Sequence, residues 1–138
     1  MAAGGGGVCR ALRQLARPLR VLAIETSCDD TAVSIVASSR RILAETACHQ
    51  HALHAPTEGI VPSLAAASHR RALPAALRHV LAAAQLSMRD VDAVAVTRGP
   101  GIASCLTVGF DAARVLAAAH QLPLYPIHHL VRISSAAP

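Results

Sequence analysis

The feature that most limits how this chain can fold is a set of three short apolar stretches joined by brief turns. Residues 21–27 (VLAIETS) and 31–38 (TAVSIVAS) are rich in β-branched residues, and only the turn CDD separates them. A second turn at residues 38–40 leads into residues 42–47. Strands with such short connections pair antiparallel. The sequence therefore predicts a three-stranded antiparallel meander.

The rest of the chain alternates between helical and strand patterns. Pro62 suits the first turn of a helix, and Pro74 is expected to kink or split that helix. Ser87 and Asp90 have the spacing of a capping box. The expected elements are a loop over 49–59, a helix over 62–86, a strand over 92–98, a helix over 105–120 and a strand over 122–127. This order predicts an α/β fold with a partly parallel sheet.

Aromatic residues are nearly missing, and this restricts how the core can be built. Apolar residues make up 53% of the chain, yet Phe110 and Tyr125 are its only aromatic residues. A core of Ala, Val, Leu and Ile favours close packing of helices on a sheet over a large aromatic pocket. No apolar stretch approaches the roughly 20 residues that a membrane-spanning helix requires, so no membrane span is expected.

The first 20 residues differ in charge from the rest. They contain Arg10, Arg13, Arg17 and Arg20 and no acidic residue, whereas the later residues carry nine arginines against eight acidic residues. An arginine-rich, acid-free segment with interspersed leucines is typical of a mitochondrial transit peptide, although the usual serines are missing. A simple Ala/Gly/Arg extension is the alternative. Because the basic excess lies mostly here, overall charge is a weak argument for nucleic-acid binding.

Polar residues surround the first turn, namely Glu25, Thr26, Asp29 and Asp30. A tight turn after a buried strand can point carboxylates and hydroxyls outward together, toward a Mg²⁺-bound phosphate. Acidic residues also occur in hairpin turns simply because they form turns well, and spacing alone leaves both interpretations open. Cys28 lies among these negative charges, which raise a thiol's pKa, so it is not expected to be a nucleophile.

A glycine-rich loop follows the predicted strand over 92–98. Gly99 and Gly101 precede a helix, so backbone N–H groups can face an anion at the helix N-terminus. The loop matches neither a Walker motif nor G-x-G-x-x-G. An ordinary strand-to-helix turn, with Gly109 allowing close packing, is an equal alternative.

Histidines form a second group of candidate ligands. His49, His51 and His54 have H-x-H-x-x-H spacing, which can bind a transition metal. Their place in a predicted loop favours exposed side chains with adventitious metal affinity. His69 and His79 are expected at the surface or at an interface of the long helix.

Four segments occur in the order and at the spacing of one known family. They are IETSCDD (24–30), GIVPSLAAASH (59–69), GPGIASCLTVG (99–109) and PIHH (126–129). On these segments the chain resembles the tRNA N6-threonylcarbamoyladenosine synthase family, also described as glycoprotease or O-sialoglycoprotein endopeptidase. With its arginine-rich beginning, it is most similar to the mitochondrial type. The resemblance covers residues 22–130.

The resemblance implies the actin-like fold of sugar kinases and Hsp70. That fold has two ribonuclease-H-like halves with a nucleotide and a metal between them. The predicted strand order matches the first half, a mixed sheet flanked by helices. We therefore expect a transit peptide over 1–20, the first ribonuclease-H-like half over 21–130, and a divergent tail over 131–138.

The resemblance also implies roles for individual residues. Asp29 and Asp30 match the family's catalytic acidic pair, with Asp30 in place of a glutamate. His129 matches the first ligand of an H-x-x-x-H metal motif, but Ile133 occupies the position of the second ligand. The family holds one divalent ion per subunit, and that site is expected to be incomplete here. The residues expected to bind nucleotide or substrate are Glu25, Thr26, Gly99 and Gly101.

The family transfers a threonylcarbamoyl group from its adenylate to N6 of an adenosine next to the tRNA anticodon. The expected partners are therefore tRNA and threonylcarbamoyl-adenylate, and the expected location is the mitochondrion. These residues contain no counterpart of the family's second half, so we expect this chain to be inactive alone. One alternative is a non-catalytic module that forms a homodimer, or a heterodimer with a full-length member. Another is a small metal- or nucleotide-binding protein.

Overall fold

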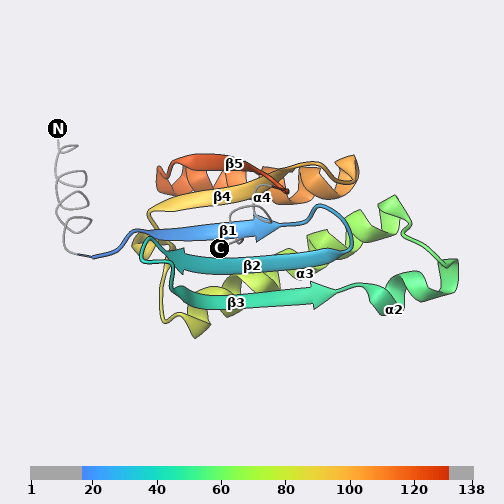
Figure 1. The fold of residues 1–138 in the computed structure, drawn as a ribbon, viewed down its shortest axis with the longest axis horizontal. Helices are drawn as coiled ribbons and strands as arrows, with labels where there is room; N and C mark the ends of the chain where they lie inside the picture. Colours follow the sequence, from blue (N-terminus) through green and yellow to red (C-terminus); the bar gives the residue numbers. More distant parts are fainter. Residues whose placement is uncertain (1–16, 131–138) are drawn as a thin grey trace.

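The computed structural model describes residues 17–130, which form a five-stranded mixed sheet with two long helices on one face. The strand order is β3-β2-β1-β4-β5 (Figure 1). The strands are β1 (Arg20–Glu25), β2 (Asp30–Ala37), β3 (Ile42–His49), β4 (Ala93–Gly99) and β5 (Leu124–His128). The helices are α2 (His51–His54), α3 (Pro62–Ala83) and α4 (Ala103–His120), with 3₁₀ turns at Ala55–Thr57 and Met88–Asp90. The predicted α/β class and the antiparallel meander are confirmed.

The strand directions bring most of the polar candidates to one edge of the sheet. β1 pairs antiparallel with β2, which pairs antiparallel with β3, while β4 runs parallel to both β1 and β5. The carboxyl ends of β1, β3, β4 and β5 and the amino end of β2 therefore lie at the same edge. The amino ends of α3 and α4 also lie there (Figure 1).

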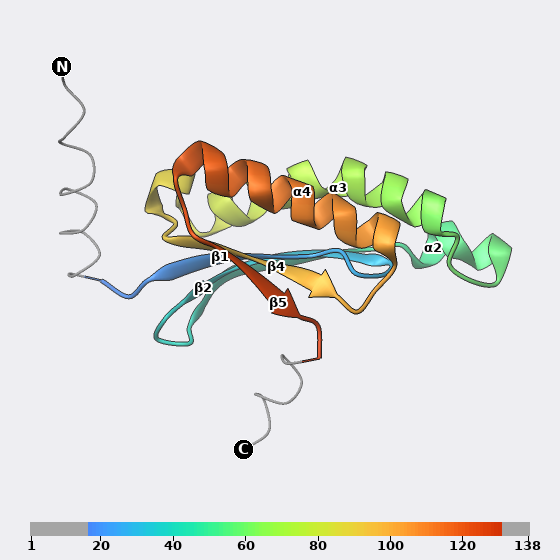
Figure 2. The ribbon, with the colours of Figure 1, turned by 90° about the horizontal axis from the view of Figure 1, so that it is seen from above.

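The core fills the space between the sheet and the two long helices. β1 alternates, with Leu22 and Ile24 buried and their neighbours half-buried on the opposite face. Helix α4 contributes small residues, Ala113 and Ala117, so that it can lie close to the strands. Fully burying one aliphatic side chain of the Val, Leu or Ile type stabilises a fold by about 1.5–3 kcal/mol. Figure 2 shows α3 and α4 on the same face, and no helix of residues 17–130 covers the other.

Two features of the helices differ from the prediction. Pro74 was expected to kink or split α3, and the split did not occur, because the helix continues through Pro74 over 22 residues. Pro74 is exposed, and water can therefore bond the carbonyl that its missing N–H leaves unpaired. The segment predicted as a loop contains α2 and the 3₁₀ turn at Ala55–Thr57. No helix in the described part of the chain is long and apolar enough to cross a membrane.

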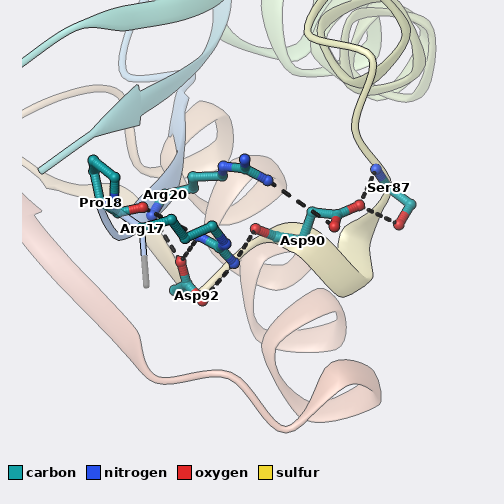
Figure 3. Close-up of polar contacts among 6 residues, drawn as sticks. All are labelled: Arg17, Pro18, Arg20, Ser87, Asp90 and Asp92. Carbon is teal, nitrogen blue, oxygen red and sulfur yellow. Dashed lines mark hydrogen bonds and ion pairs between the residues drawn. The ribbon is translucent and has the colours of Figure 1, made fainter. Parts of the chain in front are cut away.

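The first described residues are fastened to the turn before β4 (Figure 3). The guanidinium of Arg17 binds both carboxylate oxygens of Asp92, at 2.7 and 3.1 Å, and also donates to the carbonyl oxygen of Asp90. The backbone N–H of Arg20 donates to the same Asp92 carboxylate at 2.8 Å. The predicted capping box is confirmed, because Ser87 and Asp90 bond each other reciprocally. Arg17 and Arg20 lie in the segment predicted as the leader, and β1 begins at Arg20.

Candidate functional site

A polar network joins the ends of β1, β4 and β5. Oε2 of Glu25 accepts hydrogen bonds from Oγ1 of Thr97 at 2.5 Å and from Nδ1 of His129 at 3.1 Å. Its other oxygen accepts from the backbone N–H of Ser27 at 2.5 Å. A carboxylate only accepts, so Nδ1 of His129 carries the proton and Nε2 is left for a ligand. The neighbouring His128 is exposed.

The hydrogen bonds to Glu25 keep it ionised. Burial by itself raises the pKa of this carboxyl, but the bonds from Ser27, Thr97 and His129 outweigh burial and lower the pKa below the ordinary value of 4.5. The side chain of Glu25 is 20% exposed, whereas that of His129 is 41% exposed. The network therefore presents a fixed negative charge behind a solvent-facing imidazole.

The acidic turn consists of residues 26–29, between β1 and β2, together with Asp30 at the start of β2. A buried histidine is hydrogen-bonded to it. His69 of α3 is fully buried, and its Nε2 donates to the carbonyl oxygen of Cys28 at 3.0 Å. Its Nδ1 lies 2.7 Å from Oγ1 of Thr31. The expectation that His69 lies at the surface or at an interface is wrong, because it lies in the core. Helix α3 packs against β2, and this turns His69 into the core, whereas His79 is exposed as expected.

A chain of buried polar groups extends from His69 back to the start of α3. The amide nitrogen of Gln50 lies 3.4 Å from Nδ1 of His69, and its amide oxygen accepts from Nε2 of His54 at 3.1 Å. Nδ1 of His54 accepts from the backbone N–H of Val61. Every hydrogen-bond donor in this buried network faces an acceptor when both histidines carry their proton on Nε2, which assigns that tautomer to both. These buried hydrogen bonds thus connect the segment after β3 to the acidic turn.

This arrangement changes the interpretation of the H-x-H-x-x-H spacing. His54 is buried, and both of its ring nitrogens are used within the fold. It was expected to be exposed with the others, which is wrong. His49 and His51 are exposed, and His49 lies beside Asp30 at the start of β2. The three histidines therefore do not form one site.

The glycine loop contacts the acidic turn directly. Gly99 has φ +147°, a backbone conformation that favours glycine. A Cβ added at Gly101 would lie 2.5 Å from the carbonyl oxygen of Ser27 and 2.8 Å from its Cβ. The same carbonyl accepts from the backbone N–H of Ile102 at 2.8 Å. The structure therefore brings Gly101 close to the turn that carries Asp29.

Thr26 has a packing role in this structure. It is buried, its hydroxyl donates to the carbonyl oxygen of Cys105, and it accepts from the backbone N–H of Gly109. These bonds fix β1 to α4. Thr26 therefore points away from the network around Glu25, and its role in nucleotide binding stays a prediction.

Cys28 is exposed beside the acidic pair. Although the residue is exposed, partial burial of its thiol raises the thiol's pKa, and the neighbouring Asp29 raises it further. The thiol therefore stays protonated at neutral pH, as expected for a residue among negative charges. Asp29 and Asp30 are both partly exposed. The thiol is therefore not expected to act as a nucleophile, and the catalytic roles of Asp29 and Asp30 stay predictions.

The metal motif implied by the resemblance is not complete in this chain. His129 offers one imidazole nitrogen, Nε2. Glu25 accepts a hydrogen bond from the other ring nitrogen, and metal-binding histidines are commonly oriented by such a bond. Ile133, the residue at the second ligand position, cannot ligate and lies outside the described residues. One imidazole alone holds a divalent ion weakly. The residues described here therefore do not form the family's metal site.

The face of the sheet opposite the helices is concave and lined by small residues. Ala23, Ala32, Ala47 and Ala95 lie on it, and Glu25 stands at its end. The polar network is therefore continuous with an open, mostly apolar surface.

The chain matches a family model described as TsaD, tRNA N6-adenosine threonylcarbamoyltransferase, over residues 41–137. Proteins named tRNA N6-adenosine threonylcarbamoyltransferase from Staphylococcus aureus strains JH9 and Newman are 40% identical to it over 116 residues. The alignment covers 84% of this chain and 34% of each relative. The chain thus spans about a third of the length of these curated relatives.

Solved structures support the same fold. YeaZ from Pseudomonas aeruginosa has a TM-score of 0.63 at 24% identity, over 84% of this chain and 46% of YeaZ. Thermus thermophilus RuvC, solved in complex with a Holliday junction substrate, has a TM-score of 0.54 at 19% identity, over 86% of this chain and 71% of RuvC. Both have the actin-like, ribonuclease-H-like fold, so the predicted fold class is confirmed.

Proposed function

Because the chain belongs to the tRNA N6-adenosine threonylcarbamoyltransferase (TsaD) family, we propose that residues 17–130 form one side of a threonylcarbamoyl-transfer site. The observation that carries this proposal is the meeting of three features at one sheet edge. They are the acidic turn, the glycine loop and the Glu25–His129 pair. The substrates would be threonylcarbamoyl-adenylate and a tRNA adenosine next to the anticodon.

The reaction requires an amine to attack an activated carbonyl. A bond forms between N6 of adenosine and the carbamoyl carbon, the bond from that carbon to the adenylate oxygen breaks, and AMP leaves with the electron pair. The amine loses a proton in this step. Asp29 and Asp30 are the partly exposed carboxylates at this edge, and we assign them to accept that proton. His129, oriented by Glu25, would position the substrate through Nε2.

The glycine loop would receive the phosphate of the adenylate. The loop ends at the N-terminus of α4, an 18-residue helix whose first backbone N–H groups are not used within the helix. Ser27 and Ile102 hold the loop against the acidic turn through a backbone hydrogen bond of 2.8 Å. This contact would place phosphate and carboxylates a short distance apart. No step here passes through a metal ion, since the described residues do not complete that site.

We propose further that the 138 residues alone do not complete the transferase site. The chain spans about a third of the length of its relatives, and Ile133 stands where the resemblance places the second metal ligand. Pairing with a full-length family member is part of this proposal. So is a mitochondrial location, which rests on the acid-free, arginine-rich beginning of the sequence.

The decisive experiment separates binding from transfer. The full chain is titrated with a non-hydrolysable analogue of threonylcarbamoyl-adenylate, and binding is measured by calorimetry and by amide shifts in NMR spectra. We expect shifts in the glycine loop and acidic turn, and weaker binding for Gly101→Ala but not for Gly59→Ala. Gly59 is the matched control, because an added Cβ there has no neighbour closer than 4.0 Å. Absence of binding, or equal binding by both variants, contradicts the proposed site.

Transfer is then assayed with threonylcarbamoyl-adenylate and unmodified mitochondrial tRNA, and the modified nucleoside is measured by mass spectrometry. A full-length Staphylococcus aureus relative serves as the positive control. We expect no product from the chain alone, and product from the chain alone would contradict the proposed incompleteness. Fluorescent fusions of the full chain, with Arg10 and Arg13 intact or changed to Gln, test the location.

A further inference from the structure

We propose that Asp30, His49 and His51 form a binding site for one divalent transition-metal ion. Within residues 17–130, these are the only three side chains of the His, Cys, Asp and Glu types whose ligand atoms all lie within 4.8 Å of one another. The site lies at the amino end of β2 and the carboxyl end of β3. It is separate from His129, and its argument does not rest on the proposed transferase function, although the two proposals share Asp30.

The fold brings these residues together in two ways. Asp30 and His49 are direct partners in the antiparallel pairing of β2 with β3, so their side chains lie side by side. His51 begins α2, two residues after His49. The residue between them, Gln50, is buried and bonded to Ala65 and His54, which fixes the backbone from which both histidines project.

The contact between Asp30 and His49 suits a shared cation. Oδ1 of Asp30 lies 2.9 Å from Nδ1 of His49. This oxygen is shielded from solvent, yet no hydrogen bond within the described residues reaches it, because the approach of Nδ1 does not have hydrogen-bond geometry. Two ligand atoms at about 2.0–2.2 Å from one ion lie roughly 3 Å apart. An ion between them would satisfy the oxygen.

His51 can supply the third ligand. Its ring is nearly parallel to that of His49, at 15°, with the ring centroids 5.6 Å apart. It is exposed, so a rotation about its side-chain bonds brings a ring nitrogen nearer to the other two ligand atoms. His54 is not part of the site, because Gln50 and Val61 occupy its ring nitrogens.

The ligand chemistry selects the class of ion. Two imidazoles and one carboxylate favour Zn²⁺, Co²⁺, Ni²⁺ or Cu²⁺ over Mg²⁺ and Ca²⁺, which prefer oxygen ligands. The side chains of His49 and Asp30 are 58% and 43% exposed, so water would complete the coordination shell. Binding would tie β2, β3 and α2 together and would raise the melting temperature through linkage. It would also occupy the carboxylate of Asp30.

The test uses the full chain without an affinity tag and Zn²⁺ or Co²⁺ as the probe. Calorimetry gives stoichiometry and Kd, and the visible absorption of Co²⁺ reports its coordination. We expect one ion per chain, with Kd rising at least about tenfold in Asp30→Asn, His49→Ala and His51→Ala, since even outer partners of metal ligands matter by about 10–100-fold. His79→Ala, an exposed histidine of α3, should bind like the parent chain.

Two results would overturn this site. One is the absence of one-to-one binding in the parent chain. The other is a Kd that does not change in His51→Ala and Asp30→Asn, which would indicate general affinity of surface histidines. All three substituted side chains are partly or fully exposed, and far-ultraviolet circular dichroism establishes that each variant is folded.

Discussion

His69 donates a hydrogen bond from Nε2 to the carbonyl oxygen of Cys28, 3.0 Å away, across 41 residues of sequence. This bond connects the middle of a helix to the turn that carries the acidic pair. Because the imidazole is fully buried, its removal leaves a cavity beside the turn. The position of the acidic turn therefore depends in part on helix α3.

Replacing His69 should destabilise the fold strongly. In His69→Ala, a cavity forms and the partners at Cys28 and Thr31 lose their hydrogen bonds, so we expect the free energy of unfolding to fall by about 2–4 kcal/mol. His79→Ala, at an exposed position of α3, should change it by less than about 0.5 kcal/mol. Urea denaturation measures both. Equal midpoints for the two variants would show that the buried bond contributes little.

Inserting one methyl group at Gly101 should separate the glycine loop from the acidic turn. The added Cβ would collide with backbone atoms of Ser27, at 2.5 Å from the carbonyl oxygen. We expect the free energy of unfolding to fall by about 1–3 kcal/mol, the usual cost of overpacking. Gly59→Ala adds the same methyl group in open space and should not destabilise. Thermal denaturation compares them, and a stable Gly101→Ala variant would mean that the loop moves freely.

Because of the ion pair between Arg17 and Asp92, the stability of the fold should depend on the charge of Arg17. Their side chains are 24% and 5% exposed, so Arg17→Ala leaves a largely buried carboxylate with fewer donors. We expect the free energy of unfolding to fall by about 1–3 kcal/mol, which is less than the cost of breaking a fully buried pair because Arg17 is partly exposed. Arg17→Lys keeps the charge but not the two-pronged contact and should be intermediate. Denaturant midpoints that are the same for all three chains would contradict this.

Stability should depend on pH through Glu25. Its pKa is lowered in the folded chain from 4.5, so the ionised carboxylate stabilises the fold fully above about pH 4.5. That contribution is lost as the pH falls toward the lowered value. The stability advantage of the parent chain over Glu25→Gln should therefore be constant near neutral pH and shrink on acidification. Chemical denaturation of both chains from pH 7 to pH 3 gives the comparison, and a constant difference would contradict it.

The strands and long helices could be predicted because their signals are local. The three β-branched stretches and their short turns specify the meander, and Pro62 marks the start of α3. Helix α2 was missed because four residues are too few to show helical periodicity. Whether Pro74 would kink or split α3 was left open, because the sequence does not show that this position faces solvent.

The candidate site was only partly predictable for a different reason. Glu25 and His129 were candidates, but their contact joins residues 104 positions apart, and Thr97 enters the same network from a third strand. His69 and His54 were misjudged because the groups that satisfy them, on Cys28, Gln50 and Val61, come together only in the fold. His69 lies in the segment 59–69 that carried the resemblance, and this is the signal that could have identified it; His54 lies outside that segment.

The central place of β1 has a consequence for the order in which the chain can fold during synthesis. β1 pairs on one side with β2, which follows at once, and on the other with β4, where Val21 meets Ala93. The meander can therefore form early on the ribosome, but β1 has an unpaired edge until β4 has been made, about 45 residues after the end of β3. Such long-range pairing is slow compared with local contacts. Until β4 arrives, the nascent meander exposes a strand edge that a chaperone can protect.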